Sequence, residues 1–296
     1  MDKKISVVKI CLVTVTLSDG GAERCAALLS KYFDKQEFEV YHVVFSGKIE
    51  YDFAGQLFHL EHLKDKSNSW WSRSKRFFAL KEFFANHNFD YVIDFRTKQH
   101  FLQEFIIHNF VYPKFIQTIH SYKLKSYLPK NIFLAKLLYK NCQQFIAVSQ
   151  GVNEKVSSKY TFIPSQIIYN PIDFEFISEK IKEPISDDFH YVLSAGSMHK
   201  NVKQFDKLIA CYAKSILPSK NIKLIILGEG KLKNKWIKLV ESMNLQDLVI
   251  FKGNVMNPFR YYKRALFTIS TSKYEGMPMV LLESLACETP IISWNY

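Results

Sequence analysis

Residues 272–290 read SKYEGMPMVLLESLACETP, and this stretch decides the fold class. An apolar strand-like segment ends just before it, a Glu-Gly-x-Pro turn follows, and an apolar helix begins. Pro278 lies near the first turn of that helix, where a missing backbone N–H costs nothing. The backbone amides of Gly276–Val280 then point outward at a helix N-terminus, which favours an anion there.

Two glutamates accompany this anion site. Glu275 lies in the turn, and Glu283 lies about one and a half turns into the helix. Carboxylates beside an anion are unfavourable unless they accept hydrogen bonds from hydroxyl groups. The combination therefore indicates a ligand with both phosphates and hydroxyls, such as a nucleotide-sugar. The alternative is an N-terminal helix acid that the dipole favours, together with a solvated helix glutamate.

Outward from this stretch, strand-like and helix-like segments alternate, which favours parallel sheets with helices on both faces. The predicted strands are 7–17, 39–45, 91–95, 114–119, 144–148, 191–195, 223–227, 248–251, 266–270 and 290–293. The predicted helices are 22–33, 71–86, 131–142, 204–213, 232–243 and 278–287. The polar stretch 178–188 places a junction between domains 1–175 and 176–296. Ligands bind beyond the carboxyl ends of the strands in such sheets, so tandem domains predict a cleft between facing edges.

Composition restricts the class of protein. The 296 residues are 48% apolar and 23% charged, which argues against disorder. No uninterrupted apolar stretch approaches the roughly 18–20 residues that span a bilayer. The apolar run 10–17 precedes Gly20 and Gly21 rather than a cleavage site, so it predicts a buried strand and not a signal peptide. Five scattered cysteines without a Cys-x-x-Cys pair disfavour disulfides and a zinc ribbon, and favour a reducing cytosol.

The stretch 272–290 resembles the signature of the retaining glycosyltransferases of family 4. That signature has two glutamates eight positions apart around Glu-Gly-x-Pro, followed by Glu-Ala/Ser-x-Ala-x-x-x-Pro. The matching residues are Glu275, Gly276, Pro278, Glu283, Ser284, Ala286 and Pro290. Glu288 departs from the pattern, because the family most often has Gly there. The resemblance implies an α/β GT-B fold of two Rossmann-like, doubly wound parallel-sheet domains and a transferase that uses a nucleotide-diphosphate sugar.

The resemblance continues in the segment 193–206, which is similar to the family's diphosphate-binding loop. Lys203 matches the lysine of that loop, whose ammonium would neutralise charge on the leaving diphosphate. Ser197 stands where the family has arginine, and Lys200 is a candidate substitute for it. The alternative is that Lys200 and Lys203 are solvated loop lysines.

Two features of the first domain extend the resemblance. Gly20 and Gly21 are similar to the family's Gly-Gly-Ala-Glu loop, which borders the donor phosphates and the acceptor. Asp19 and Glu23 would face an acceptor hydroxyl there, although helix capping explains Asp19 equally well. His120, at the carboxyl end of a predicted strand, matches the histidine that reaches the transferred sugar. The alternative is a structural histidine.

The resemblance also implies which residues would form the active site. The catalytic residues would be Glu275, His120 and Lys203. The donor-binding residues would be Gly20, Gly21, Gly253, Gly276, Met277, Pro278, Met279, Val280 and Glu283. No Asp-x-Asp motif occurs, so we expect metal-independent chemistry without a cofactor and with a UDP- or GDP-sugar as donor. The family expectation is front-face attack assisted by the leaving phosphate, without a protein nucleophile.

The net charge of the chain is +12, and the acidic and basic residues are unevenly distributed within the first domain. No acid occurs from 105 to 153, while six lysines do. Basic and aromatic residues together suit a helix in an anionic membrane interface, and they also suit stacking on single-stranded nucleic acid. A core helix with solvated lysines is the third interpretation. The residues of the predicted membrane or acceptor surface are Trp70, Trp71, Arg73, Lys75, Arg76, Lys123, Lys125, Lys130 and Lys136.

The chain ends at Tyr296, soon after a predicted buried strand, whereas members of the family continue further. We therefore expect a second domain that is truncated at its C-terminus. The expected function is retaining transfer of a hexose or N-acetylhexosamine to a cell-surface polysaccharide, lipopolysaccharide or lipid-linked glycan. The expected location is cytoplasmic, peripheral at the inner face of the cell membrane, with no nucleic-acid partner. The alternatives are a degenerate or truncated homologue without transferase activity and a basic nucleic-acid-binding protein.

Overall fold

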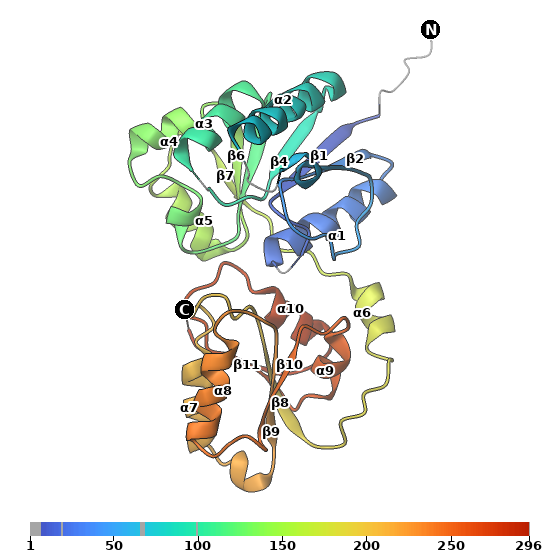
Figure 1. Cartoon of the computed structure of the whole chain (residues 1–296), viewed down its shortest axis with the longest axis vertical. Helices are drawn as coiled ribbons and strands as arrows, with labels where there is room; N and C mark the ends of the chain where they lie inside the picture. The colour runs from blue at the N-terminus through green and yellow to red at the C-terminus, as the bar shows by residue number, and fades with distance from the viewer. Residues whose placement is uncertain (1–6, 19, 66–68, 99, 296) are drawn as a thin grey trace. The chain divides into compact units, whose positions relative to one another are not determined.

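The computed structural model describes residues 7–18, 20–65, 69–98 and 100–295. The chain divides into two compact units, Met1–Pro171 and Ile172–Tyr296, which are described one at a time. Each unit has one sheet of parallel strands with helices packed on it (Figure 1). The predicted fold class, two doubly wound α/β domains, is confirmed.

The first unit contains a seven-stranded sheet, in the order β3-β2-β1-β4-β5-β6-β7, with every neighbouring pair parallel. Its strands are β1 (Lys9–Thr14), β2 (Glu39–Val44), β3 (Gln56–His59), β4 (Tyr91–Asp94), β5 (Phe115–Ile119), β6 (Cys142–Ala147) and β7 (Ser165–Ile167). β1 is almost entirely buried, because helices cover both faces of a parallel sheet.

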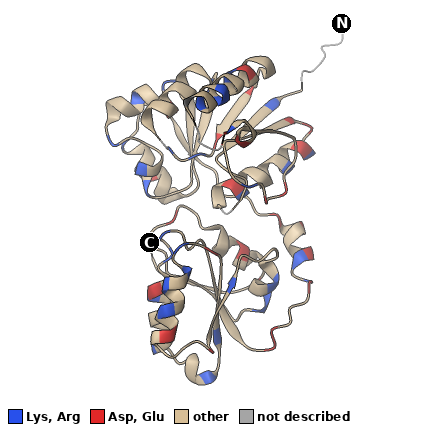
Figure 2. Ribbon diagram, viewed as in Figure 1, with Lys and Arg blue, Asp and Glu red and all other residues tan. Residues whose placement is uncertain are grey.

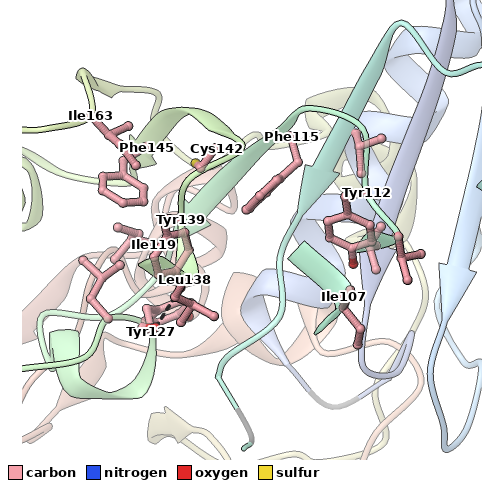
Figure 3. Close-up of a cluster of buried hydrophobic side chains, with 14 of the residues drawn as sticks. Ile107, Tyr112, Phe115, Ile119, Tyr127, Leu138, Tyr139, Cys142, Phe145 and Ile163 are labelled. Atoms are coloured by element: carbon pink, nitrogen blue, oxygen red, sulfur yellow. Dashed lines mark hydrogen bonds between the residues drawn. The ribbon is translucent and has the colours of Figure 1, made fainter. Parts of the chain in front are cut away.

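The helices of the first unit divide between the two faces of its sheet. They are α1 (Gly21–Lys35), α2 (Trp70–His87), α3 (Phe101–Phe110), α4 (Ile132–Leu138) and α5 (Gln150–Ser157), with short 3₁₀ turns η1 (Leu60–Leu63) and η2 (Leu124–Ser126). Helices α2 to α5 share one large core with the sheet, whereas α1 packs on β1 and β2 from the other side. Aromatic rings fill the large core, and the Tyr139 hydroxyl donates to the Tyr127 carbonyl there at 2.8 Å (Figure 3).

The second unit contains a five-stranded parallel sheet in the order β10-β9-β8-β11-β12. Its strands are β8 (Tyr191–Ala195), β9 (Lys223–Leu227), β10 (Val249–Gly253), β11 (Thr268–Ser270) and β12 (Ile291–Ser293). Helices α7 (Phe205–Lys214) and α8 (Lys233–Ser242) cover one face. Helices α6 (Phe174–Lys180), α9 (Phe259–Arg264) and α10 (Met279–Ala286) cover the other, and η3 (Pro218–Lys220) is a short turn. Two cores therefore flank β8, the central strand.

Two predicted elements extend several residues beyond the observed ones. The helix expected at 131–142 is α4, which ends at Leu138, and Cys142 begins β6 instead. The Tyr139 side chain turns back to Tyr127, and the Cys142 N–H donates to the Tyr139 carbonyl at 3.0 Å, which closes a turn. The strand predicted at 7–17 is longer than the observed strand, because β1 spans only Lys9–Thr14. Leu17 lies beyond the end of β1 and forms an isolated bridge with Ile49.

Candidate functional site

The carboxyl edge of the second sheet brings the loops after β8 and β11 together. Lys203 Nζ lies 2.8 Å from Oε1 of Glu275, and both side chains are more than four-fifths buried. The loop backbones are joined as well, because the Lys273 N–H donates to the Val202 carbonyl at 2.8 Å. The Thr271 hydroxyl donates to the Lys203 carbonyl at 2.8 Å. Two of the predicted catalytic residues are thus in direct contact.

Glycines allow these loops to approach each other. Gly196 has a φ of +154°, and a Cβ there would lie 2.6 Å from Cε of Lys203. Gly228, after β9, has a φ of +118°, and a Cβ there would overlap the Gly196 carbonyl oxygen. A side chain at either position would displace Lys203 or separate the loops. Gly253, predicted near the nucleobase, lies at the same edge, since its carbonyl accepts from the Gly228 N–H at 2.8 Å.

The Glu-Gly-x-Pro turn leads directly into α10. Pro278 is the residue before the first helical residue, Met279, and has extended backbone angles. Gly276, Met277 and Val280 are half-buried, so the turn remains partly accessible. The first amides of a helix have no acceptor within the helix, and its start carries a partial positive charge. The turn beside Glu275 therefore leads into a helix N-terminus, as the sequence predicts, and its role in anion binding stays a prediction.

Glu283 is buried on α10 with 4% of its surface exposed. Burial, together with the charge of Glu283, raises the pKa of the neighbouring Cys287 thiol to about 12. The next residue, Ser284, donates to Thr268 Oγ1 at 2.8 Å and so fastens α10 to β11. Glu283 consequently lies on a rigid helix, and its predicted contact with a ribose stays a prediction.

Ser197, which stands where the family has arginine, lies in the loop after β8. Ser197 Oγ accepts a hydrogen bond from the His199 N–H at 3.4 Å, so its hydroxyl serves the loop turn. Lys200 is exposed, whereas Lys203 is not. The interpretation of Lys203 as a solvated loop lysine is therefore wrong, because its ammonium is buried against a carboxylate. Whether Lys200 replaces the arginine stays a prediction.

In the first unit, the loop after β1 leads into α1. Gly20 is the N-cap residue and Gly21 begins the helix. A Cβ on Gly20 would overlap the carboxylate of Glu23, so this side chain folds back over the start of α1. A carboxylate is favourable there because of the helix dipole. Asp19, the other predicted acceptor-side residue, lies outside the described residues.

His120 follows directly after β5, at the carboxyl edge of the first sheet. Both of its ring nitrogens are buried and have no hydrogen-bond partner among the described residues. Burial lowers the pKa of His120 to about 4, so the imidazole is neutral at pH 7. Its ring packs on the Phe95 ring, with centroids 5.6 Å apart. An unpaired buried imidazole is costly, but His42 inside β2 shares this state, so it is the position of His120 at the carboxyl edge that makes it a candidate for ligand contact.

A buried ion cluster near this edge was not predicted. Arg96 Nη2 lies 2.7 Å from Asp94 Oδ2 and 3.0 Å from Glu104 Oε2, and all three residues are at most 5% exposed. His108 Nε2 lies 3.6 Å from Asp94 Oδ2, and the Tyr112 hydroxyl donates to the same oxygen at 3.1 Å. The one sequence signal is an acid, an aromatic residue and an arginine in succession at the end of a strand.

Most of the predicted surface residues belong to α2, Lys136 belongs to α4, and the other lysines lie between β5 and α4; Figure 2 marks the Lys and Arg positions in blue. On α4, Phe133 is 76% exposed, and Leu137 and Lys136 are exposed beside it. On α2, Trp71 is 77% exposed, one helical turn from Lys75. The other predicted surface residues that are exposed are Arg73, Lys125 and Lys130.

Two predicted surface residues are less accessible. Arg76 is half-buried, with its Nε 3.4 Å from the Ser72 carbonyl, and Lys123 is half-buried beside η2. Trp70 is the first residue of α2. Sequence reasoning missed Leu102 and Phe110 on α3, which are 68% and 62% exposed. They extend the apolar surface, because the Asn109 side chain of α3 donates to the Leu137 carbonyl of α4 at 3.3 Å.

No helix among the described residues is both long and apolar enough to cross a membrane. No group of three or more His, Cys, Asp or Glu side chains in this part of the chain is arranged to hold a metal ion.

Two family models match the chain and together cover nearly all of it. The model described as Glycosyltransferase Family 4 matches residues 19–176. The model described as Glycosyl transferases group 1 matches residues 175–296.

The related proteins are named as transferases. The N-acetylgalactosamine-N,N'-diacetylbacillosaminyl-diphospho-undecaprenol 4-alpha-N-acetylgalactosaminyltransferase of Campylobacter jejuni is 29% identical over 97% of this chain and 81% of its own length. A second C. jejuni protein, an alpha-1,4-N-acetyl-D-galactosaminyltransferase whose name specifies a GalNAc-bearing diNAcBac-PP-undecaprenol, is 29% identical over 98% of this chain and 80% of its own length.

Solved structures share the fold. Anabaena HepE in complex with UDP and glucose superposes with a TM-score of 0.73 at 16% identity, over 97% of this chain and 80% of its own. A glycosyltransferase from Rickettsia africae gives a TM-score of 0.71 at 16% identity, over 98% of this chain and 80% of its own.

Proposed function

Because this chain belongs to glycosyltransferase family 4, we propose that it transfers a hexose or N-acetylhexosamine from a UDP- or GDP-sugar to a lipid-linked glycan or cell-surface polysaccharide, with retention of configuration. The observation that carries the proposal is the contact between Lys203 and Glu275 beside the start of α10. The names of the C. jejuni relatives, which specify diphospho-undecaprenol-linked acceptors, support a lipid-linked acceptor.

The Lys203–Glu275 pair can exchange its partners when a donor binds. A diphosphate at the start of α10 would attract the Lys203 ammonium, which is 2.8 Å from the Glu275 carboxylate before binding. Glu275 would then be free to accept hydrogen bonds from sugar hydroxyls. As the diphosphate leaves, its growing charge is stabilised by the same ammonium and by the helix amides, which are already oriented. Remaining donor contacts would come from Glu283 and Gly253.

His120 is proposed to contact the transferred sugar from the first unit. Its neutral imidazole has a donor and an acceptor nitrogen, and both lack a partner among the described residues. Sugar hydroxyls both donate and accept, so they complement a neutral ring better than an imidazolium. Retention is proposed to follow from front-face attack assisted by the leaving phosphate, without a protein nucleophile.

We propose that transfer needs no metal ion, because Lys203 and the start of α10 can offset the charge of the diphosphate. Activity should therefore persist in EDTA to within about twofold of the untreated enzyme. Donor turnover that collapses in EDTA and returns with Mg²⁺ or Mn²⁺ would contradict this part of the proposal.

The central test is to disrupt the Lys203–Glu275 pair. Glu275→Gln and Lys203→Met should each lower kcat/KM for the donor by about 10²- to 10³-fold, since each removes a charge that acts on the transition state. The assay would measure release of UDP or GDP from a panel of nucleotide-sugars.

A matched control is available in the same unit. Lys252 Nζ lies 2.8 Å from Asp187 Oδ1, and both side chains are mostly buried. Asp187→Asn and Lys252→Met should cost similar stability with little change in turnover. If the two pairs behave alike, the Lys203–Glu275 pair is structural only. A chain that binds no nucleotide diphosphate at all would favour the degenerate-homologue alternative that Ser197 suggests.

We also propose that the first unit docks peripherally on an anionic membrane, at the cytoplasmic, inner face of the cell membrane. Support comes from the surface of α3 and α4, where exposed Phe110, Phe133 and Leu137 accompany Lys136. No acid lies between 105 and 153 to repel anionic lipid. Such docking would bring the chain to a lipid-linked acceptor.

A further inference from the structure

We propose that Phe95 is a positioning residue that orients the His120 imidazole, and that the buried Asp94–Arg96–Glu104 cluster holds Phe95 in place. This inference rests on the proposed role of His120 in sugar transfer. It assigns a task to a set of buried charges that the proposed reaction does not otherwise use.

The alternation of side chains along β4 and β5 places the ion cluster and His120 on opposite faces of the sheet. Asp94 lies opposite Gln117 in the β4–β5 register, and successive side chains point to opposite faces of a sheet. Asp94, Arg96 and Gln117 therefore share one face. Phe95 and His120 share the other, where their rings lie 5.6 Å apart at an interplanar angle of 35°.

The backbone on both sides of Phe95 is fixed by hydrogen bonds. The Phe95 N–H donates to the Val13 carbonyl at 2.9 Å, which extends the pairing of β4 with β1. Gln117 Nε2 donates to the Asp94 carbonyl at 2.9 Å and to the Arg96 carbonyl at 3.2 Å. The Thr118 hydroxyl donates to the Asp94 carbonyl at 3.1 Å. The backbone at Phe95 therefore cannot shift without breaking one of these bonds.

The ion cluster keeps the Arg96 side chain inside the first unit. The guanidinium contacts both Asp94 and Glu104 and stacks on Phe45, 4.2 Å from the ring centroid. Buried ion pairs contribute little net stability, because desolvation offsets much of the attraction. Their strict geometry is better suited to fixing one conformation of the chain, here the turn of the backbone that presents Phe95 to His120.

Packing must orient His120, because hydrogen bonds do not. Neither ring nitrogen has a partner among the described residues. Phe95 is 3% exposed, so its ring cannot rotate away without opening a cavity. The Phe95 ring is thus the contact that decides where the imidazole nitrogens point.

The test compares two phenylalanines that each pack against a histidine ring. Phe95→Leu should lower kcat about tenfold while KM for the donor changes less than about twofold, because the reacting geometry is disturbed and donor binding is not. The His120 ring resonances should shift in NMR spectra, and its pKa should rise as water gains access. The control is Phe89→Leu, since Phe89 is 8% exposed and stacks on His87 at 5.5 Å. It should cost similar stability and leave kcat and the His120 resonances unchanged.

A second variant acts from a distance. Gln117→Met removes the two bonds to the carbonyls that flank Phe95 and leaves both rings intact, so it should shift the same His120 resonances. Unchanged His120 resonances in both Phe95→Leu and Gln117→Met would overturn the inference. A full-activity Phe95→Leu beside an inactive His120→Ala would also overturn it, while leaving the proposed function intact. A fully active His120→Ala would instead remove the proposed role of His120, and the resonances would still decide whether Phe95 orients it.

Discussion

Among single residues, Asp94 shows how strongly neighbouring side chains can stabilise a buried carboxylate. Burial alone would raise its pKa, but Arg96 and His108 outweigh burial and lower the pKa of Asp94 to about 2. His120 shows the opposite case, because no charged partner in the described part of the chain offsets burial and its pKa falls to about 4. One edge of the first sheet thus contains an ionised acid and a neutral base.

The Asp94 pKa predicts acid sensitivity of the first unit. A folded pKa below the ordinary value of 3.8 contributes stability that is present above pH 3.8 and lost as the pH falls through 2. At neutral pH the ionised state is favoured by roughly 2 kcal/mol relative to a protonated Asp94, which is not the net contribution of the ion pair to stability. Denaturant unfolding followed between pH 5 and 2 should show this loss. The Asp94→Asn variant should be less stable at pH 7, and this part of its pH dependence should disappear. If the free energy of unfolding of the variant still falls with pH as steeply as in the wild type, the lowered pKa does not belong to Asp94.

Some of the site was predictable at this scale and some was not. Glu275 and Lys203 could be named because the short stretches of sequence around them resemble motifs of the family. The Asp94–Arg96–Glu104 cluster could not, because its members meet only after β4, β5 and α3 have packed. The unpaired ring nitrogens of His120 likewise depend on tertiary burial and leave no trace in the sequence.

Among the elements, α10 combines the anion-binding start with an unusual end. Glu288, where the family most often has Gly, has a φ of +60°. Such a left-handed residue after a helix is usually Gly, because a side chain is strained there. Glu288 pairs with Lys263 at 2.6 Å, an exposed contact that adds little.

Glu288→Gly should therefore stabilise the second unit. The substitution relieves the left-handed strain and loses only an exposed ion pair, so the melting temperature should rise slightly. Differential scanning calorimetry would measure it, with Glu241→Gly as a control that should lower the melting temperature, since Glu241 lies inside α8. A lower melting temperature for Glu288→Gly would mean that the pair with Lys263 outweighs the strain.

The sequence predicted the central elements better than the marginal ones. Strands such as 191–195 and 223–227 were predicted to the residue, because continuous apolar runs mark buried parallel strands. The strands β3 and β7 were missed, since they are short, lie at the edges of the first sheet and are half-exposed. The helices α3, α6 and α9 were missed as well. The seven residues of α6 and the six of α9 are too few to show a helical period, whereas the ten residues of α3 are not.

At the scale of the whole molecule, the asymmetric charge of the first unit predicts salt-sensitive membrane binding. The wild-type chain should float with vesicles of phosphatidylglycerol and phosphatidylcholine at low salt, and less so at high salt. Replacing Phe133 and Leu137 with Ser should lower the partition about tenfold, because both insert apolar area.

Phe174→Ser provides the control for membrane binding. Phe174 is 67% exposed but lies in the second unit, so its loss should leave flotation unchanged. Equal binding to vesicles of phosphatidylcholine alone, or equal loss in the control, would refute the assignment of the docking surface to α3 and α4.

The inner position of β1 and β8 has a consequence for folding during synthesis. Each is the first strand of its unit, yet each pairs with a strand on both sides. One side of β8 has no partner until β11, which includes Thr268, has been synthesised. The first unit can complete its sheet at β7 before any strand of the second is made. The apolar edge of β8 stays unpaired while residues 196–267 are translated, and parallel pairings across such separations form slowly. Chaperone dependence should therefore concentrate in that interval of translation.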